Sequence, residues 1–279
     1  MRSGSRDVPQ RSRNAHPRPV PHAAGQPYAG GSYGHLLGQG DMTLLHLATA
    51  TSTMDVARQL LEDGDTTTSI VLTDEQTAGR GRHNRPWITF DAPYGHAATF
   101  ILRPQVGPHF PLLVALALHE AISPLVPGRT LALKWPNDLL LDGKKAAGIL
   151  CENPVLSNGV KASLVGIGLN IRQPEGDIPE SFQGAFLNAD IAPENLAKSI
   201  WACMQPLLTL YATQGWTSAL SENYVQRCAT IGQTIVWQRG QPNELTGYAR
   251  SLTKDGHLEL VADDGTVHVI HSGEIFDKR

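Results

Sequence analysis

The pattern of hydrophobic residues changes near Arg227, and this change limits the possible folds more than any other feature. Before it, apolar segments of strand length alternate with segments of helical periodicity, as in domains that pack helices against a sheet. After it, only short strand-like segments occur, separated by the turn pairs Asp255-Gly256 and Asp264-Gly265. Four short strands within about fifty residues are typical of a small barrel. We therefore expect an α+β fold followed by an all-β appendage.

The expected elements follow from hydrophobic period and turn residues. Strands are predicted at 44–48, 70–72, 97–102, 131–135, 139–141, 148–151, 163–169, 235–237, 246–251, 258–261 and 267–270. Helices are predicted from a cap at Ser52 or Thr53 to a stop at Gly64, and over 111–122, 193–213 and 215–227. Asp142-Gly143 predicts a hairpin between the two strands that flank it.

Composition is that of a soluble protein. Hydrophobic residues make up 41% of the 279 residues, charged residues 18%, and no apolar run is long enough to cross a bilayer. The formal charge of −3 gives no overall attraction to nucleic acid. The cysteines Cys151, Cys203 and Cys228 are far apart and odd in number, which favours a reducing compartment over a disulfide framework. A cytoplasmic protein is expected.

Residues 1–41 are rich in proline, glycine and arginine and lack aliphatic periodicity, so we expect them to be disordered. A basic, acid-poor segment also suits an organelle transit peptide, although five prolines disfavour the amphipathic helix of such peptides. Nothing before Leu44 has the pattern of a DNA-recognition helix. The predicted organisation is a tail over 1–41, a main domain over 42–228 and a small β domain over 229–279.

The segment from Gln76 to Trp87 is the strongest indication of function. Arg80, Arg82 and Arg85 stand within six residues, and Gly79 and Gly81 allow the backbone to approach a ligand closely. Arginine presents a planar, permanently charged fork that matches phosphate and carboxylate oxygens. This loop predicts chemistry on a phosphate or a carboxylate.

Three further segments carry polar groups at strand ends. In Lys134–Asp138, the pair Trp135-Pro136 ends a strand, after which Asn137 and Asp138 project from a turn. In Lys144–Glu152, adjacent lysines point to opposite faces, so only one of them faces a site. Each pattern alone also fits a plain turn or an exposed hairpin. The third segment, Gly166–Asn170, is a glycine-flanked strand end that alone indicates packing as readily as binding.

Several common sites are absent from the sequence. No Walker pattern and no dinucleotide-binding glycine motif follows a strand, and histidine and cysteine lack metal-ligand spacing. His83 and His96 are the histidines nearest the motifs, and we expect both at the surface. The sequence thus leaves the identity of any metal ligands open.

Taken together and in this order, these segments resemble the biotin–protein ligases, in a form without an N-terminal DNA-binding domain. The resemblance extends from about Leu44 to the C-terminus and includes Ser272–Ile275. It implies a mixed-sheet domain of the class II aminoacyl-tRNA synthetase and biotin ligase type, followed by an SH3-like β-barrel. It also implies formation of biotinyl-5′-adenylate from biotin and ATP with Mg²⁺, then transfer of biotin to a lysine of a carboxylase's biotin carboxyl carrier domain. Neither nucleic acid nor a membrane is an implied partner, and a homodimer is a further implied possibility.

The resemblance also assigns roles to individual residues. Lys145 and Arg82 are the expected catalytic residues. The expected biotin-binding residues are Ser52, Thr53, Gln76, Gly79, Arg80, Gly81, Arg82, Lys145 and Gly148. The expected nucleotide-binding residues are Arg82, Arg85, Trp87, Lys134, Asn137, Asp138 and Asn170.

Three residues depart from the family pattern. Met54 and His96 stand where asparagine is frequent, and Asn84 stands where glycine is usual. Asparagine tolerates a left-handed backbone, so we expect the loop geometry to survive, with reduced biotin affinity. Two alternatives stay open, namely a lipoate or octanoate ligase and a non-catalytic sensor of biotin or biotinyl-AMP.

Overall fold

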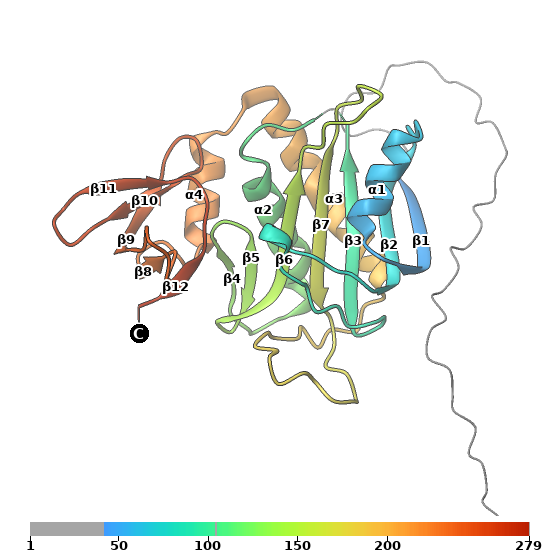
Figure 1. Cartoon of the computed structure of the whole chain (residues 1–279), viewed down its shortest axis with the longest axis horizontal. Coiled ribbons are helices and arrows are strands. Elements are labelled where there is room, and N and C mark those ends of the chain that lie inside the picture. The colour runs from blue at the N-terminus through green and yellow to red at the C-terminus, as the bar shows by residue number, and fades with distance from the viewer. Residues whose placement is uncertain (1–41, 104, 279) are drawn as a thin grey trace, which may run out of the picture. The chain divides into compact units, whose positions relative to one another are not determined.

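The computed structural model describes residues 42–103 and 105–278. The predictions for residues 1–41 concern a segment outside these residues. Within the described part, the strands form one large mixed sheet and one small antiparallel sheet (Figure 1). This arrangement confirms the expected α+β fold with an all-β appendage.

The large sheet has seven strands. They are β1 (Thr43–Ala50), β2 (Thr68–Gln76), β3 (Gly95–Leu102), β4 (Leu131–Lys134), β5 (Asp138–Leu141), β6 (Lys144–Glu152) and β7 (Ser163–Asn170). Their order is β1-β2-β3-β7-β6-β5-β4. Only β1 and β2 run parallel; every other neighbouring pair is antiparallel. The β5–β6 hairpin turns through Asp142 and Gly143, which both have positive φ (50° and 78°), as a tight turn of this kind requires.

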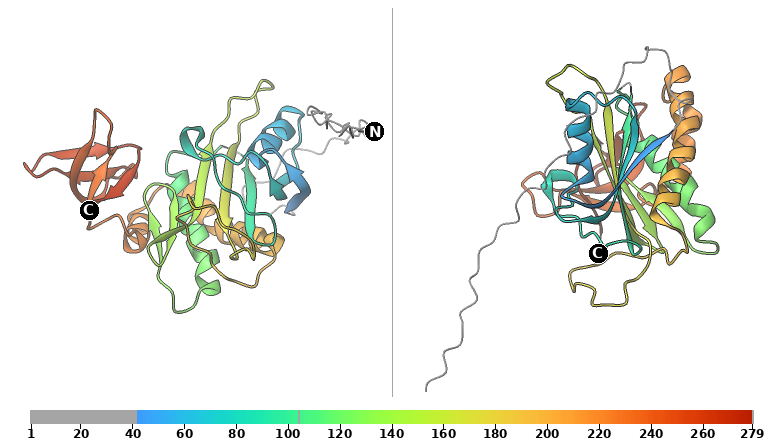
Figure 2. Two further views of the ribbon diagram at one scale, coloured as in Figure 1. Left: turned by 60° about the horizontal axis from the view of Figure 1, so that its bottom comes forward. Right: turned by 90° about the vertical axis from the view of Figure 1, so that its right-hand side faces the viewer.

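Helices cover both faces of this sheet. They are α1 (Thr53–Glu62), α2 (Phe110–Ile122), α3 (Pro193–Gln214) and α4 (Ser218–Arg227), with short 3₁₀ turns at Arg82–Asn84 and Ser123–Leu125. Figure 2 shows α1 on one face and α2 and α3 on the other. Helix α2 is apolar on nearly all sides and almost wholly buried, as expected for a helix in the middle of a core. The face beside α1 is less covered and holds the site described below.

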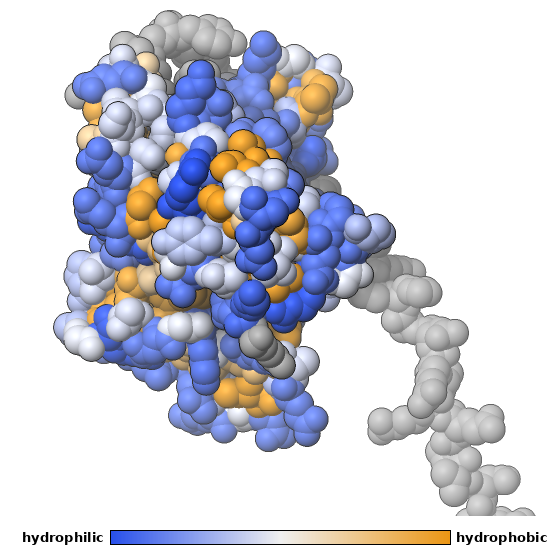
Figure 3. All heavy atoms as spheres, turned by 90° about the vertical axis from the view of Figure 1, so that its left-hand side faces the viewer, coloured by the Kyte–Doolittle hydropathy of each residue, from blue (hydrophilic) through white to orange (hydrophobic). Residues whose placement is uncertain are grey.

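The small sheet is formed by the C-terminal strands. They are β8 (Thr234–Trp237), β9 (Leu245–Leu252), β10 (Leu258–Val261), β11 (Val267–Ile270) and β12 (Ile275–Asp277), in the order β11-β10-β9-β8-β12. Figure 3 shows the side of the molecule on which Figure 1 draws this sheet, and on this side hydrophobic residues form small groups separated by hydrophilic ones.

Trp135 ties this sheet to the main domain. Its side chain is buried, and its indole Nε1 donates a hydrogen bond of 3.1 Å to the Gly256 carbonyl in the β9–β10 turn. Its backbone N–H donates another of 3.1 Å to the hydroxyl of Thr230. The small sheet therefore contacts the strand end at Lys134–Asp138, and its last residues reach the same region.

Every strand and helix predicted from hydrophobic period is present, with two differences at the C-terminal side. Helix α4 begins at Ser218 because Gly215 has a φ of 71° and the Thr217 hydroxyl caps the helix by accepting from the Leu220 N–H at 3.3 Å. Strand β12 was not predicted, because three residues are too few to show a period. It pairs with β8 and brings the residues before it to the main domain.

Candidate active site

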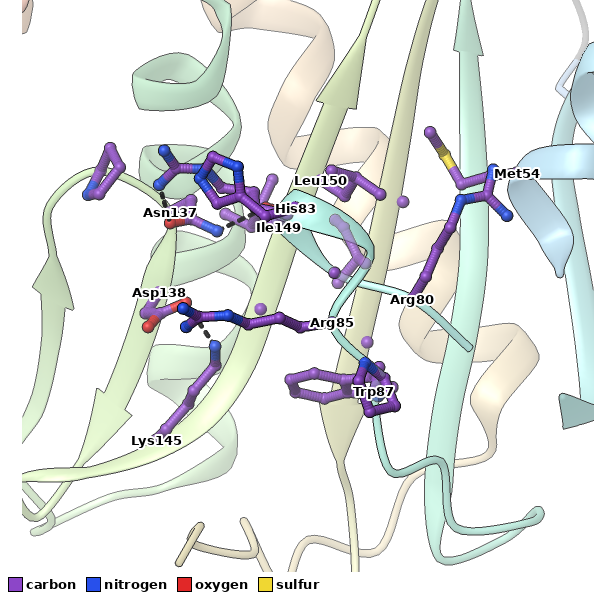
Figure 4. Close-up of a pocket in the computed structure, with 18 of the residues that line it drawn as sticks. Met54, Arg80, His83, Arg85, Trp87, Asn137, Asp138, Lys145, Ile149 and Leu150 are labelled. Atoms are coloured by element: carbon purple, nitrogen blue, oxygen red, sulfur yellow. Dashed lines mark hydrogen bonds and ion pairs between the residues drawn. The ribbon is translucent and has the colours of Figure 1, made fainter. Parts of the chain in front are cut away.

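A cavity of about 400 Å³ opens on the α1 side of the large sheet (Figure 4). Its walls come from the start of α1, the loop after β2, the strands β6 and β7, the turn before β5, and residues 273–276 before and within β12. Its lining differs from one end to the other. We call the end formed by Arg82, Arg85, Lys134, Asn137, Asp138, Lys145 and Glu274 the charged end. We call the end formed by Ser52, Thr53, Met54, Gln76, Leu150 and Gly166 the neutral end. The charge of Arg80, which also lies there, is paired with the carboxylate of Asp55.

Ion pairs organise the charged end. The Lys145 ammonium lies 2.7 Å from Oδ1 of Asp138, and Arg85 pairs with Glu274 of the small sheet. The Asp138 Oδ1 atom is buried, and Lys145 compensates its charge. Four cationic side chains face two carboxylates at this end, so an anionic ligand would enter a field of net positive charge.

Arg82 lies at the centre of the charged end. Its guanidinium donates to Asn137 Oδ1 at 3.2 Å and to the Gly273 carbonyl at 3.5 Å. Asn137 is itself fixed, because its amide donates to the Ile149 carbonyl at 2.9 Å. Burial lowers the pKa of Arg82, while the Asp138 carboxylate opposes that shift. A half-buried cation held by neutral acceptors is well placed to attract an anion.

Hydrogen bonds between neutral groups organise the other end. Gln76 Oε1 accepts from the Thr53 backbone N–H at 3.0 Å and from the Thr53 hydroxyl at 3.3 Å. The Thr53 hydroxyl in turn accepts from Thr99 at 2.9 Å. Ser52, Thr53 and Thr99 are all buried. These groups offer donors and acceptors to a polar, uncharged part of a ligand.

Trp87 packs on two glycines in the floor of the cavity. A Cβ atom at Gly168 would lie 2.5 Å from the indole Nε1, and one at Gly148 would lie 3.0 Å from Cζ3. The Lys145 ammonium lies 5.3 Å from the centre of the indole ring, within cation–π range. Any side chain larger than hydrogen at position 168 would displace the indole.

The arginine loop folds back on itself between Gly79 and Trp87. Gly81 N–H donates to the Arg85 carbonyl at 2.8 Å, and Trp87 N–H donates to the Gly79 carbonyl at 2.9 Å. His83 and Asn84 have φ angles of 57° and 55°. The left-handed backbone expected for Asn84 is therefore confirmed, and asparagine is one of the residues that adopt it most readily.

Most of the predicted site residues meet in this cavity. The lining contains Ser52, Thr53, Gln76, Arg80, Gly81, Arg82, Arg85, Trp87, Lys134, Asn137, Asp138, Lys145 and Gly148. Arg80 also makes a bidentate pair with Asp55 of α1, at 2.8 and 2.7 Å. Of the two adjacent lysines, Lys145 lines the cavity, whereas Lys144 is exposed and lies outside the lining.

Two predicted site residues lie outside the lining. Asn170 is buried and donates to the Ala185 carbonyl at 3.1 Å. Gly79 begins the arginine loop, and a Cβ atom there would be within 3 Å of Gln76, Thr89 and the Trp87 carbonyl. In the structure Asn170 is held by a hydrogen bond and Gly79 by close packing, and neither lines the cavity.

The expectation for His96 was wrong. This residue is 1% exposed, and burial lowers the pKa of its imidazole to about 4, so the ring is neutral near pH 7. It lies on β3 at the face that α3 covers, and a lone histidine in an apolar strand gives no sequence signal for either face. His83 is exposed, as expected.

Sequence reasoning missed part of the lining. Ile149, Leu150, Gly166 and the segment 273–276 belong to the cavity and had no assigned role. The pair Glu274-Ile275 was a possible signal, because a charged residue directly precedes a strand in the small sheet. Leu150 and Ile149 look like ordinary core residues of a strand and give no signal at all.

The described residues contain neither a cluster of metal-binding side chains nor a membrane-spanning helix. Among them, no group of three or more histidine, cysteine or acidic side chains is arranged to hold a metal ion. No described helix combines the length and the apolar character needed to span a membrane.

Comparisons with known proteins point in one direction. Residues 47–170 match the model of the biotin/lipoate A/B protein ligase family. A biotin–[acetyl-CoA-carboxylase] ligase of Paracoccus denitrificans is 35% identical over 223 residues, which cover 74% of this chain and 89% of the relative.

Two solved structures are similar over most of the chain. A biotin protein ligase of Aquifex aeolicus, solved with biotin and ATP, superposes with a TM-score of 0.70 at 22% identity, covering 84% of this chain and 97% of that one. A biotin protein ligase of Leishmania major, solved with biotinyl-5-AMP, superposes with a TM-score of 0.54 at 26% identity, covering 82% and 98%.

Proposed function

Because this chain belongs to the biotin–protein ligase family, we propose that it activates biotin with ATP and transfers it to a lysine of a carrier protein. The observation that best supports this reaction is the division of one cavity into two ends. The charged end suits a triphosphate and a carboxylate, and the neutral end suits the uncharged ring of an acid.

In the first step, a carboxylate oxygen of biotin bonds to the α-phosphorus of ATP, and pyrophosphate leaves with the electrons of the broken P–O bond. Two anions must approach each other, so the largest barrier is electrostatic. Lys145 and Arg82 supply positive charge where the two anions meet. The Lys145–Asp138 pair at 2.7 Å is exchanged for a contact between Lys145 and the ligand.

In the second step, the neutral amine of a carrier lysine attacks the acyl carbon, AMP leaves, and the amine loses a proton. The mixed anhydride must be shielded from water until the carrier arrives. The loop from Gly79 to Trp87 supports this role, because it already lies over the cavity and Arg85 connects it to Glu274. A loop of this kind closes over the adenylate and opens to the carrier.

Magnesium is part of the proposal. The residues that would hold it are Asp138 and Asn137, because Mg²⁺ prefers oxygen ligands and is commonly bound by one or two carboxylates together with phosphates. The metal would neutralise charge on the departing pyrophosphate. Asp138 would then have two roles, as the partner of Lys145 before ATP binds and as a residue that would hold the metal afterwards.

The proposed acceptor is the biotin carboxyl carrier domain of a biotin-dependent carboxylase. The name of the Paracoccus relative gives acetyl-CoA carboxylase as the protein on which that relative acts. Mass spectrometry of a purified carrier domain, incubated with this chain, biotin and ATP, tests the acceptor through the gain of one biotinyl group. We also propose that the chain forms a homodimer, which sedimentation of the same mixture without carrier tests.

The activity itself is tested by biotin-dependent exchange of labelled pyrophosphate into ATP. Lipoate and octanoate are run in parallel, because the matching family model also covers lipoate ligases. Exchange with biotin alone supports the proposal. Exchange only with lipoate or octanoate assigns the chain to that other activity, and biotin binding without exchange supports a sensor.

A further inference from the structure

Met54 lies at the neutral end of the cavity, across the pocket from Lys145 and Asp138 (Figure 4). It is in the first turn of α1, and only 3% of it is exposed. The two residues before it, Ser52 and Thr53, carry hydroxyl groups that can donate hydrogen bonds, whereas the thioether of Met54 cannot donate one.

The side chain of Met54 closes an apolar wall. A Cβ atom at Gly166 would lie 3.0 Å from the Met54 sulfur and 3.1 Å from its Cγ, so the thioether lies directly over the β7 backbone. Leu150 lines the cavity beside it, and both residues pack into the cluster that contains Ala57 and Leu61. Neither Met54 nor Leu150 has a hydrogen-bond donor in its side chain.

A charged side chain beside Met54 is held by a residue of α1. Arg80 lies beside Met54 in Figure 4, and its two terminal nitrogens donate to the two oxygens of Asp55 at 2.8 and 2.7 Å. The hydroxyl of Thr53 donates to Gln76. The polar groups of this end therefore form one wall, with Met54 and Leu150 forming another.

This inference rests on the proposed function. We propose that Met54 determines which acids the enzyme activates, by requiring an apolar surface on the ring that faces it. The ureido group of biotin finds partners on the wall of Ser52, Thr53 and Gln76, which leaves the sulfur-containing ring against Met54 and Leu150. An unoxidised thioether fits that wall, whereas a sulfoxide oxygen there would face the side chains of Met54 and Leu150, neither of which carries a hydrogen-bond donor.

The expected effect is a loss of at least about tenfold in kcat/KM for biotin sulfoxide relative to biotin, because a buried, unpaired acceptor loses its hydrogen bonds to water. Dethiobiotin, which lacks the sulfur, keeps an apolar edge and is expected to remain a substrate. If dethiobiotin reacts at a rate similar to that of biotin, the site requires an apolar edge on the ligand but not the sulfur atom itself.

The test measures pyrophosphate exchange with biotin, dethiobiotin and biotin sulfoxide for the unaltered enzyme and three variants. Met54→Asn and Met54→Gln add an amide donor, and each should reduce the preference for biotin over the sulfoxide about tenfold. Met54→Leu stays apolar at similar volume and should keep the preference. Thermal melting identifies any variant that is not folded. Because two amide variants of different length are made, the test can still be carried out if one of them does not fold.

An unchanged preference in folded amide variants would overturn the proposal, as would an equal change in Met54→Leu. A sulfoxide accepted as well as biotin by the unaltered enzyme would also overturn it and would assign the donor to Arg80. If no variant and no unaltered enzyme exchanges with biotin, the proposed function fails instead. Calorimetric titration of the same three acids then tests the selectivity of Met54 by binding alone.

Discussion

The two ends of the cavity differ in how their side chains are held. At the charged end, Lys145 and Arg85 are paired with Asp138 and Glu274, and these ion pairs must be exchanged when a ligand arrives. At the neutral end, Thr53 and Gln76 are tied to each other and to buried Thr99, so the groups are fixed before binding. From this difference we predict that the two ends serve different steps. Changes at the charged end should act on the chemical step, and changes at the neutral end on binding of the acid.

The largest expected effect is that of Lys145→Ala. Removing a preorganised charge that stabilises the transition state lowers kcat by about 10²- to 10³-fold. Steady-state kinetics of pyrophosphate exchange, with biotin and ATP each varied, measure kcat and both KM values. The matched control is Lys144→Ala, because Lys144 is the adjacent residue of the same strand but is exposed and outside the cavity.

An equal loss in both lysine variants would mean that the charge of the hairpin matters rather than the position of one ammonium group. A normal kcat with a raised KM for biotin would assign Lys145 to binding. Either result would remove the distinction between the two ends.

Gly168→Ala tests whether the packing of Trp87 on Gly168, in the floor of the cavity, is needed for activity. The new methyl group would lie 2.5 Å from the Trp87 indole, so the ring or the β7 backbone must move. Overpacking of this kind costs about 1–3 kcal/mol, which predicts a loss of about ten- to a hundredfold in kcat/KM for biotin. The change in tryptophan emission on biotin binding, compared with that of a Trp87→Phe variant, isolates the signal of Trp87 from the other four tryptophans and reports its displacement.

The control for this change is Gly176→Ala. Gly176 has no atom near the position of a new Cβ and lies outside the cavity. Similar kinetics for the two alanine variants would show that contact between Gly168 and Trp87 is unimportant for activity.

Sequence reasoning found the charged end more completely than the neutral end, and the reason is physical. Arginine and lysine beside glycine, or after a strand-ending Trp135-Pro136, depart from what a fold alone requires, so they stand out. Thr53 and Gln76 were assigned only through the family resemblance, because hydroxyl and amide groups near a helix start are also ordinary caps. Leu150 and Gly166 form part of the same end and look like strand interior.

Two misses have the same origin. His96 was expected at the surface, but whether its face of β3 is covered depends on α3, which lies far along the chain. The contribution of Gly273 and Glu274 depends on how the small sheet docks through Trp135. Periodicity identifies elements, whereas contacts between distant elements decide which side chains enter the site.

Thr53→Val should raise the KM for biotin about tenfold with little change in kcat. Valine keeps the shape of threonine but removes the hydroxyl that links Gln76 and Thr99, and one lost hydrogen bond in a buried site costs about 1.4 kcal/mol, or a factor of ten. Pyrophosphate exchange with biotin and ATP each varied measures the KM for biotin, and the KM for ATP should stay constant. A fall in kcat equal to that of Lys145→Ala would contradict the separation of binding from chemistry.

The smallest expected effect is that of Glu274→Gln, which removes the ion pair between the small sheet and the arginine loop. Arg85 is 59% exposed and Glu274 32%, and exposed pairs contribute about 0.2–1 kcal/mol, so kcat/KM should fall no more than about fivefold. Screening predicts that the difference from the unaltered enzyme disappears near 1 M salt.

Glu259→Gln is the matched control, because Glu259 pairs with Arg250 on the same small sheet but outside the cavity. If Glu274→Gln lost activity as severely as Lys145→Ala, and kept that loss at high salt, closure by the small sheet would be part of the chemical step. Glu274 would then act in the chemical step together with Lys145 and the arginine loop.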